Sequence, residues 1–222
     1  MLKSSQFTKH PLDPQGVWCQ ILKRPPPGRP ALFLDRDGAV VEDTGYLCEV
    51  GDIAVIAGSA EVIAAANRRG VPVVMVTNQA GIARGYYGWD EFKSVQDAIV
   101  GSLAGKNARI DAVYACPHHP QGKGALAHPD HPARKPNPGM LLQAASALAL
   151  DLRSSWLVGD KAEDIEAAKR AGIAGALLVA TGYGSAERQR AATLASQTFE
   201  VRFGRSIADA MMLPILTSDH GG

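Results

Sequence analysis

The sequence has few cysteines and almost no excess of charge of either sign. Its 222 residues include only 3 cysteines, Cys19, Cys48 and Cys116, which are far apart and odd in number. A disulfide framework is therefore not expected, and the chain suits a reducing cytoplasm. Lysine and arginine number 23 against 22 acidic residues, so no overall field favours nucleic acid or a membrane surface as a partner.

Long hydrophobic runs are also missing. No apolar run approaches the roughly 18 residues of a membrane-spanning helix, and the first 16 residues lack the hydrophobic core of a signal peptide. The sequence shows no internal repeat. These absences favour one ordinary cytoplasmic domain, 31–222, preceded by a proline-rich arm, 1–30, and we expect a monomer.

The chain is organised around the segment 31–38, which reads Ala-Leu-Phe-Leu-Asp-Arg-Asp-Gly. Its four apolar residues are typical of a buried parallel strand, and two carboxylates, Asp35 and Asp37, follow at once. In an open α/β sheet the ligand crevice lies beyond the carboxyl ends of the strands. Two acids at this spacing can share a divalent cation, whereas the plainer alternative is an Asx-turn after the strand.

Two later segments also place polar groups where a strand ends or a helix begins. The strand expected at 71–76 ends in Thr77 and Asn78, whose hydroxyl, amide and free backbone N–H groups suit phosphoryl oxygens. Arg134 and Lys135 stand just ahead of a predicted helix start. Cations and free N–H groups at such a point together form an anion site.

A further strand, expected at 156–160, ends in Asp160, and Lys161 and Asp164 follow on the first turn of the next helix. Asp160 is thereby predicted to return to the sheet edge that carries Asp35. It adds the third oxygen ligand that a hard cation such as Mg²⁺ requires.

Together these groups predict a phosphoryl-transfer site. Asp35, at the strand end, is the expected nucleophile that forms an aspartyl-phosphate, and Asp37 the expected general acid and base. Mg²⁺ between Asp35 and Asp160 would let an anionic carboxylate approach an anionic phosphate. Thr77 is expected to bind phosphoryl oxygens, and Lys161 to support the metal edge.

The stretch 116–136 is rich in histidine and proline. Cys116, His118, His128 and His131 offer the number and type of ligands that a tetrahedral zinc site requires, so a structural zinc ion is one interpretation. The alternative is a proline-stiffened loop whose histidines are merely polar, since no second pair of cysteines is present.

More detailed motifs narrow the interpretation. They are Leu-Asp-Arg-Asp-Gly at 34–38, Asp-Thr-Gly-Tyr at 43–46, Thr-Asn-Gln-Ala-Gly-Ile-Ala-Arg-Gly at 77–85, Cys-Pro-His-His-Pro at 116–120, Arg-Lys-Pro at 134–136 and Gly-Asp-Lys at 159–161. Over about residues 31–180 the chain resembles the haloacid dehalogenase superfamily. Within it, the chain resembles the branch of the D-glycero-D-manno-heptose 1,7-bisphosphate 7-phosphatases and histidinol-phosphate phosphatases.

The resemblance implies a Rossmann-like, three-layer α/β sandwich with a mostly parallel central sheet, no large cap domain, and a Mg²⁺-dependent phosphatase. It assigns Mg²⁺ to Asp35, Asp160 and the backbone carbonyl of Asp37, with Asp164 in support, and phosphate oxygens to Lys135. The residues that it implies for contacts with a small phosphorylated substrate are Asp43, Thr44, Gly45, Tyr46, Thr77, Asn78, Gln79, Ala80, Arg134, Lys135 and Lys161.

The chain departs from this family in the zinc loop. The family's second ligand pair, Cys-x-Cys, is replaced here by His131 and Ala133, so that His119 or His128 would have to stand in. The loss puts the zinc ion in question while leaving the phosphatase motifs intact.

The resemblance implies hydrolysis of heptose 1,7-bisphosphate at the 7-phosphate, and Arg134 beside the site suits a second phosphate. Histidinol phosphate or another small phosphomonoester is the alternative substrate. A phosphotransferase or mutase is a different class, and an uncapped site with Asp37 intact favours hydrolysis over both. A catalytically silent binding module would be expected to lack Asp35 or Asp37, and both are present.

Overall fold

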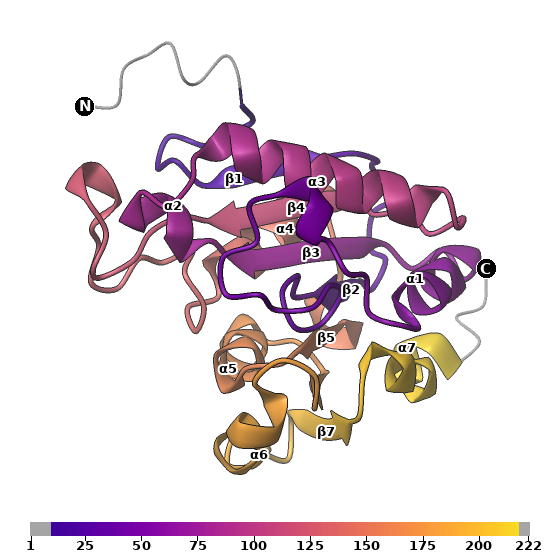
Figure 1. The fold of residues 1–222 in the computed structure, drawn as a ribbon. Helices are drawn as coiled ribbons and strands as arrows, with labels where there is room; N and C mark the ends of the chain where they lie inside the picture. The colour runs from indigo at the N-terminus through magenta and orange to yellow at the C-terminus, as the bar shows by residue number, and fades with distance from the viewer. Residues whose placement is uncertain (1–9, 218–222) are drawn as a thin grey trace.

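The structure, a computed structural model, describes residues 10–217 (Figure 1). Two stretches of the predicted organisation, 1–9 in the arm and 218–222 at the end of the domain, lie outside the described residues. A central sheet carries helices on both faces, which confirms the expected three-layer α/β sandwich. Within the described residues no insertion forms a large cap.

The central sheet of the described chain has seven strands in the order β1-β4-β3-β2-β5-β6-β7. All neighbouring pairs are parallel except β1 with β4. The strands from β2 to β6 are almost wholly buried, as expected where helices cover both faces. The strands are β1 (Trp18–Ile21), β2 (Leu32–Leu34), β3 (Val73–Asn78), β4 (Ala112–Cys116), β5 (Trp156–Gly159), β6 (Gly175–Val179) and β7 (Glu200–Gly204).

Helices pack on the two faces of the sheet in two groups. Side chains from α1, α3 and α7 join the core on one face, and those from α4, α5 and α6 join the core on the other. The helices are α1 (Ser59–Arg68), α2 (Ala80–Arg84), α3 (Trp89–Ala104), α4 (Gly139–Leu148), α5 (Ala162–Ala171), α6 (Gly184–Ala192) and α7 (Pro214–Thr217), with 3-10 turns η1 (Val50–Asp52), η2 (Gly124–Leu126), η3 (Leu152–Ser154) and η4 (Ile207–Met212).

The order of the strands reverses beside β2. From β2 the chain builds outward to β3 and β4 and then returns to place β5 on the other side of β2. Such a reversal opens a crevice at the carboxyl ends of the two central strands. Leu34 at the end of β2 pairs with Val158 in β5, so the residues that follow these strands emerge side by side.

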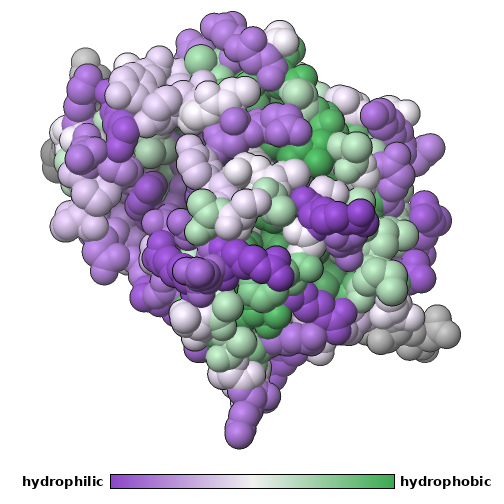
Figure 2. Space-filling model, turned by 60° about the horizontal axis from the view of Figure 1, so that its bottom comes forward, coloured by the Kyte–Doolittle hydropathy of each residue, from purple (hydrophilic) through white to green (hydrophobic). Residues whose placement is uncertain are grey.

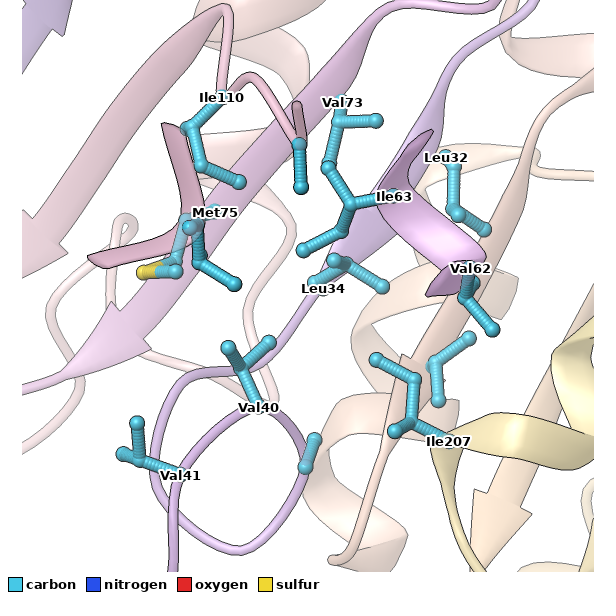
Figure 3. Close-up of a cluster of buried hydrophobic side chains, with 14 of the residues drawn as sticks. Leu32, Leu34, Val40, Val41, Val62, Ile63, Val73, Met75, Ile110 and Ile207 are labelled. Carbon is cyan, nitrogen blue, oxygen red and sulfur yellow. The ribbon is translucent and has the colours of Figure 1, made fainter. Parts of the chain in front are cut away.

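The core on the α1 face explains how the first strand is held in register. Figure 3 shows side chains of β2, β3 and α1, among them Leu34, Met75 and Ile63, gathered in one buried cluster. Val40 and Val41, from the loop just beyond Asp37, belong to the same cluster and are fully buried. The turn that carries the two acids is therefore anchored on both sides by hydrophobic burial, worth about 1.5–3 kcal/mol per large side chain.

The arm that the sequence left without a role adds a strand to the sheet. β1 pairs antiparallel with β4, and Trp18 at its start is fully buried against Trp89 and Phe92 of α3. The proline-rich segment after β1 leads the chain back to β2. Residues 10–30 are thus part of the same folded unit as the rest of the chain.

Strand boundaries differ from the expected ones by one or two residues. The strand expected at 71–76 is β3, so Thr77 and Asn78 belong to the strand and pair with Ala115 and Cys116 of β4. Pro72 lacks an N–H group to contribute to the sheet, which delays the start of the strand. The polar residues therefore stand on a rigid strand end rather than in the following loop.

Most of the face in Figure 2 is hydrophilic, and hydrophobic side chains reach the surface there mainly in hollows between polar groups. Across residues 10–217, none of the helices combines the length and hydrophobicity needed to cross a membrane.

Candidate active site

Three buried carboxylates meet in the crevice between β2 and β5. Asp35 follows β2, Asp160 follows β5, and Asp164 lies in the first turn of α5. An oxygen from each lies within 4.8 Å of the others, and within residues 10–217 this is the only such set of three potential metal ligands. Asp164 also accepts a hydrogen bond from the backbone N–H of Lys161 at 3.0 Å, which satisfies a free N–H group at the start of α5.

Two of these acids, Asp35 and Asp160, have raised pKa values. Burial raises the pKa of Asp160 to about 8, with further contributions from the charges of Asp35 and Asp164. Burial likewise raises the pKa of Asp35, although the positive charge of Lys135 opposes the shift. Carboxyl groups that resist ionisation in this way are at the same time groups that a bound cation would stabilise in the ionised form.

Lys135 places a buried ammonium group between two of the acids. Its Nζ lies 2.7 Å from Oδ1 of Asp35 and 2.6 Å from Oδ1 of Asp164, and it also donates to the carbonyl of Val76 at 2.9 Å. These two carboxylates raise the pKa of Lys135 above its usual range despite its burial. The side chain of Asn78 fixes the backbone of Lys135 through two hydrogen bonds, of 3.0 and 3.1 Å.

Two glycines make room for the carboxylate of Asp160. A Cβ atom at Gly38 would lie 2.4 Å from Oδ2 of Asp160, and one at Gly182 would lie 2.2 Å from the same atom. Both glycines have positive φ angles, +88° and +57°, which side chains other than glycine rarely adopt. The same Oδ2 accepts a hydrogen bond from the N–H of Tyr183 at 2.9 Å.

The three acids fit a hard divalent cation. Oδ1 of Asp160 is buried and has no hydrogen-bond partner within the described chain, although a buried polar atom is normally paired. Both oxygens of Asp164 already accept hydrogen bonds, from Lys135 and from the Lys161 N–H, so Asp164 suits the supporting role expected of it. Carboxylate oxygens are ligands that Mg²⁺ prefers, with further oxygen ligands such as waters completing its octahedron.

Asp37 lies beside this cluster but points elsewhere. Its carboxylate accepts two hydrogen bonds of 2.9 Å from the neighbouring Arg36 and one of 3.0 Å from Gln79. Thr77 is buried at the end of β3, where its hydroxyl accepts from Gln79 at 2.9 Å. Asp35, Asp37 and Thr77 line one small cavity together with Asn78 and Lys135.

A larger pocket of about 400 Å³ opens above the acids. Asp43, Gly45 and Tyr46 from the predicted substrate loop line it, as do Asn78, Gln79 and Ala80, whereas Thr44 is exposed and does not line it. Arg134 and Lys161 supply positive charge. Lys161 lies 3.2 Å from Asp43 and 4.6 Å above the ring of Tyr183, and these contacts fix the loop against the strand end.

One wall of the pocket was missed by sequence reasoning. It consists of Glu163 in α5, Tyr183, and Glu187 and Arg190 in α6. The segment of α6 is short and mostly polar, with no strong apolar periodicity, so its sequence gave no sign of a helix beside the site. The glycine-rich turn at 181–185 was the available signal.

The predicted zinc ligands of the histidine-rich loop lie near one another but do not converge on one point, and the zinc ion stays a prediction. The rings of His118 and His131 are stacked, with centroids 3.7 Å apart and planes within 4° of parallel. A zinc ion lies about 2.0–2.1 Å from an imidazole nitrogen, close to the ring plane, so two stacked rings cannot direct their lone pairs at one ion. Cys116, with Sγ 3.9 Å from Nδ1 of His131, and His128 complete no convergent set, because no group of three from this loop meets within 4.8 Å.

Other bonds hold the loop instead. Nε2 of His118 lies 2.8 Å from the carbonyl oxygen of Gln15 in the N-terminal arm, and Nδ1 of His131 accepts from the N–H of Ala133 at 3.1 Å. Burial lowers the pKa of His131 to about 4, so the stacked imidazole is neutral.

Comparisons with known proteins agree with the site. A family model described as HAD-hydrolase-like matches residues 132–201. The D-glycero-beta-D-manno-heptose-1,7-bisphosphate 7-phosphatase of Mesorhizobium japonicum is 50% identical over 174 residues, which cover 78% of this chain and 80% of that protein.

Two crystal structures are similar over most of the chain. A putative HAD-like phosphatase from Mesorhizobium loti has a TM-score of 0.84 and 42% identity, covering 96% of this chain and 100% of that chain. The D,D-heptose 1,7-bisphosphate phosphatase from B. bronchiseptica, solved with magnesium and phosphate, has a TM-score of 0.70 and 30% identity. The match covers 80% of this chain and 94% of that chain.

The fold, the cluster of acids and these similarities define a phosphatase of the haloacid dehalogenase superfamily, a phosphoric monoester hydrolase. Within that superfamily, the chain belongs to the family of the D-glycero-D-manno-heptose 1,7-bisphosphate 7-phosphatases.

Proposed function

We propose that this chain hydrolyses D-glycero-β-D-manno-heptose 1,7-bisphosphate at the 7-phosphate, through an aspartyl-phosphate intermediate and with Mg²⁺ bound. The observation that carries the proposal is the buried set of Asp35, Asp160 and Asp164, with Lys135 between two of them at the point where the strand order reverses. The named substrate of the Mesorhizobium japonicum relative supplies the identity of the sugar.

Each polar group has a role in this reaction. Asp35 attacks phosphorus, and Asp37 gives a proton to the departing sugar oxygen and then takes one from the water that hydrolyses the intermediate. Lys135 and Thr77 bind oxygens of the transferred phosphoryl group. Because Lys135 is held by two carboxylates and a carbonyl, it is oriented before the substrate arrives.

Asp35, Asp160 and the backbone carbonyl of Asp37 would hold the metal ion, with Asp164 in support. When bound, Mg²⁺ would reduce the repulsion between the anionic nucleophile and the anionic phosphate. The raised pKa values of Asp35 and Asp160 support this assignment, because a nearby cation favours the ionised form of each.

The second phosphate of the substrate fits the positive part of the larger pocket. Arg134 and Lys161, which were expected to contact the substrate, and Arg190 from the missed wall all line this pocket. A guanidinium can bind a phosphate through two parallel hydrogen bonds. Lys161 is paired with Asp43 and Arg190 with Glu187, so Arg134 is the cation that favours a second phosphate over the cationic amine of histidinol phosphate.

The cellular setting is part of the same proposal. We infer a cytoplasmic enzyme, which is supported by the free thiols of Cys19, Cys48 and Cys116 in the described chain. The expected monomer stays a prediction.

The direct test is phosphate release with Mg²⁺ from a panel of heptose 1,7-bisphosphate, fructose 1,6-bisphosphate, histidinol phosphate and 4-nitrophenyl phosphate. We expect kcat/KM for the heptose bisphosphate to exceed the others by about tenfold or more, and ³¹P NMR to show loss of the 7-phosphate signal alone. The Asp35→Asn variant should be inactive on all four esters. Equal, low values across the panel would contradict the substrate, and an active Asp35→Asn would contradict the mechanism.

A further inference from the structure

We propose that Arg36, Gln79 and Tyr87 form a clamp that fixes the carboxylate of Asp37 for proton transfer, and that none of the three acts by binding the substrate. The inference rests on the proposed function, in which Asp37 serves the departing oxygen and the water. It assigns Gln79, which was predicted to contact the substrate, a positioning role instead.

The hydrogen-bonding capacity of the Gln79 side chain is fully used within the protein. Its amide nitrogen donates to Asp37 Oδ2 at 3.0 Å and to Thr77 Oγ1 at 2.9 Å. Its oxygen accepts from Arg36 Nη2 at 3.2 Å and from the hydroxyl of Tyr87. A glutamine side chain has two donors and two acceptor positions, so none remains for a ligand. The residue is also only 2% exposed.

Arg36 contributes to the lining of the larger pocket but is almost wholly buried. It is 1% exposed, and its guanidinium lies 5.5 Å from the centre of the Phe92 ring, on the side of the α3 core. Two of its nitrogens contact both oxygens of Asp37 at 2.9 Å, which is the parallel geometry of a strong arginine–carboxylate pair. The carboxylate thus receives three hydrogen bonds and has little freedom to rotate.

Tyr87 closes the clamp from the other side. The space for its ring exists because residue 81 is glycine: a Cβ atom there would lie 2.2 Å from Cε1 of Tyr87. Burial raises the pKa of Tyr87 above its usual range, so its hydroxyl remains a donor to Gln79. Phe92 is in turn packed against Trp18, which connects the clamp to the N-terminal strand β1.

Fixing Asp37 matters because proton transfer depends on distance and direction. A general acid must lie within hydrogen-bonding reach of the oxygen that departs. A misplacement of about 1 Å can lower a rate by about 100-fold. Asp37 lines both the small cavity beside Asp35 and the larger pocket, so its carboxylate borders the space that the nucleophile and the sugar would share.

The test compares two esters that differ in their need for a proton. The oxygen of a sugar leaves as an alcohol and requires protonation, whereas nitrophenolate departs without it. Single-turnover measurements with enzyme in excess over ester read the first chemical step for each substrate. The variants are Gln79→Met, which keeps the length of the side chain, and Tyr87→Phe, which removes one hydroxyl group.

We expect both variants to slow release of the heptose phosphate by roughly 10- to 100-fold, within the range that a general acid contributes. Release of nitrophenolate in the same experiment should stay within about twofold of the unaltered protein, and KM for the heptose bisphosphate should change by less than about threefold. Gln96→Met and Tyr114→Phe are matched controls, because both residues are buried and line neither cavity of the site, so these changes should alter neither rate.

Three outcomes would overturn the clamp: an unchanged rate on both esters, an equal loss on both, or a rise in KM for the sugar at constant kcat. The last result would mean that Gln79 binds the substrate. Should Gln79→Met fail to fold, Tyr87→Phe alone decides, because it removes a single oxygen. Failure of the proposed function is a separate result, since it would appear as an unaltered protein that is inactive on the sugar or as an active Asp35→Asn variant.

Discussion

Replacing Lys135 by methionine tests whether the buried lysine neutralises the acid cluster. The substitution keeps the volume of the side chain but removes the ammonium group that lies 2.7 Å from Asp35 and 2.6 Å from Asp164. Both carboxylates are buried, and Asp160 is nearby with an unpaired oxygen. Without the lysine, three acids would share the crevice, and the half-buried Lys161 would be left to offset their negative charge.

The magnitude follows from the burial of the pair. Breaking a buried ion pair by removing one partner costs about 3–5 kcal/mol of the free energy of unfolding. In a chain of this size 1 kcal/mol shifts Tm by about 2–4 °C. We therefore expect the Lys135→Met protein, stripped of metal by EDTA, to melt roughly 6–20 °C below the unaltered protein.

The assay is a pair of thermal melts for each protein, one in EDTA and one in saturating Mg²⁺. A ligand present at 1,000 times its Kd stabilises the native state by about 4.1 kcal/mol. Because the variant lacks the competing ammonium group, Mg²⁺ should raise its Tm by more than it raises that of the unaltered protein. Lys93→Met is the control: its pair with Asp97 is about half exposed, so the change in stability should stay within about 0.5 kcal/mol.

Two results would refute the reasoning. If Lys135→Met melts within about 1 °C of the unaltered protein in EDTA, the lysine does not hold the cluster together. If Mg²⁺ raises the Tm of both proteins equally, the ion and the ammonium group do not act on the same carboxylates.

Two further predictions follow from contacts around the site. Gly38→Ala forces a side chain to φ +88° and to within 2.4 Å of Asp160, so the Mg²⁺ concentration for half-maximal activity should rise about tenfold or more; Gly51→Ala, where nothing lies within 4 Å, should leave it unchanged. His131→Asn keeps an acceptor for the Ala133 N–H but removes a ring whose pKa burial lowers from 6.5 to about 4. The neutral ring contributes fully to the free energy of unfolding above pH 6.5, and this contribution is lost as the pH falls toward 4. Between these pH values the Tm of the variant should therefore fall by less than the Tm of the unaltered protein, with or without EDTA. A decline parallel to that of the unaltered protein would contradict the second prediction.

The cluster of acids could be predicted from the sequence because it follows from strand order alone. Each of Asp35 and Asp160 comes directly after a buried strand, and parallel strands end at the same edge. Lys135 was found through its position before a helix, although its contact with Asp164 was not. Local patterns were enough here, since the sheet supplies the long-range geometry.

The fate of individual polar side chains could not be predicted in the same way. The Thr-Asn-Gln segment is typical of ligand binding. In the structure, however, Gln79 is hydrogen-bonded to Arg36, 43 residues away, and Asn78 to the backbone of Lys135. Whether a polar group binds a ligand or another side chain depends on which partners the fold brings close to it. Those partners are distant in sequence, so neighbouring residues do not predict the outcome.

The histidine-rich loop shows the same limit. One cysteine and three histidines suit zinc by type and number, but His118 also contacts the carbonyl of Gln15, 103 residues earlier in the chain, and stacks on His131. The arm itself could not be given a role because its strand pairs with β4, far along the sequence.

The pairing of β1 with β4 protects the protein against aggregation through an open sheet edge. β4 consists of five buried residues, and without β1 its unpaired N–H and C=O groups would form an open sheet edge, the usual template for aggregation. β1 covers that edge with a strand that is itself only partly buried after Trp18. A shortened chain that began at Ala31 would retain every proposed catalytic residue and yet expose this hydrophobic edge. We therefore expect such a chain to aggregate although its catalytic residues are intact.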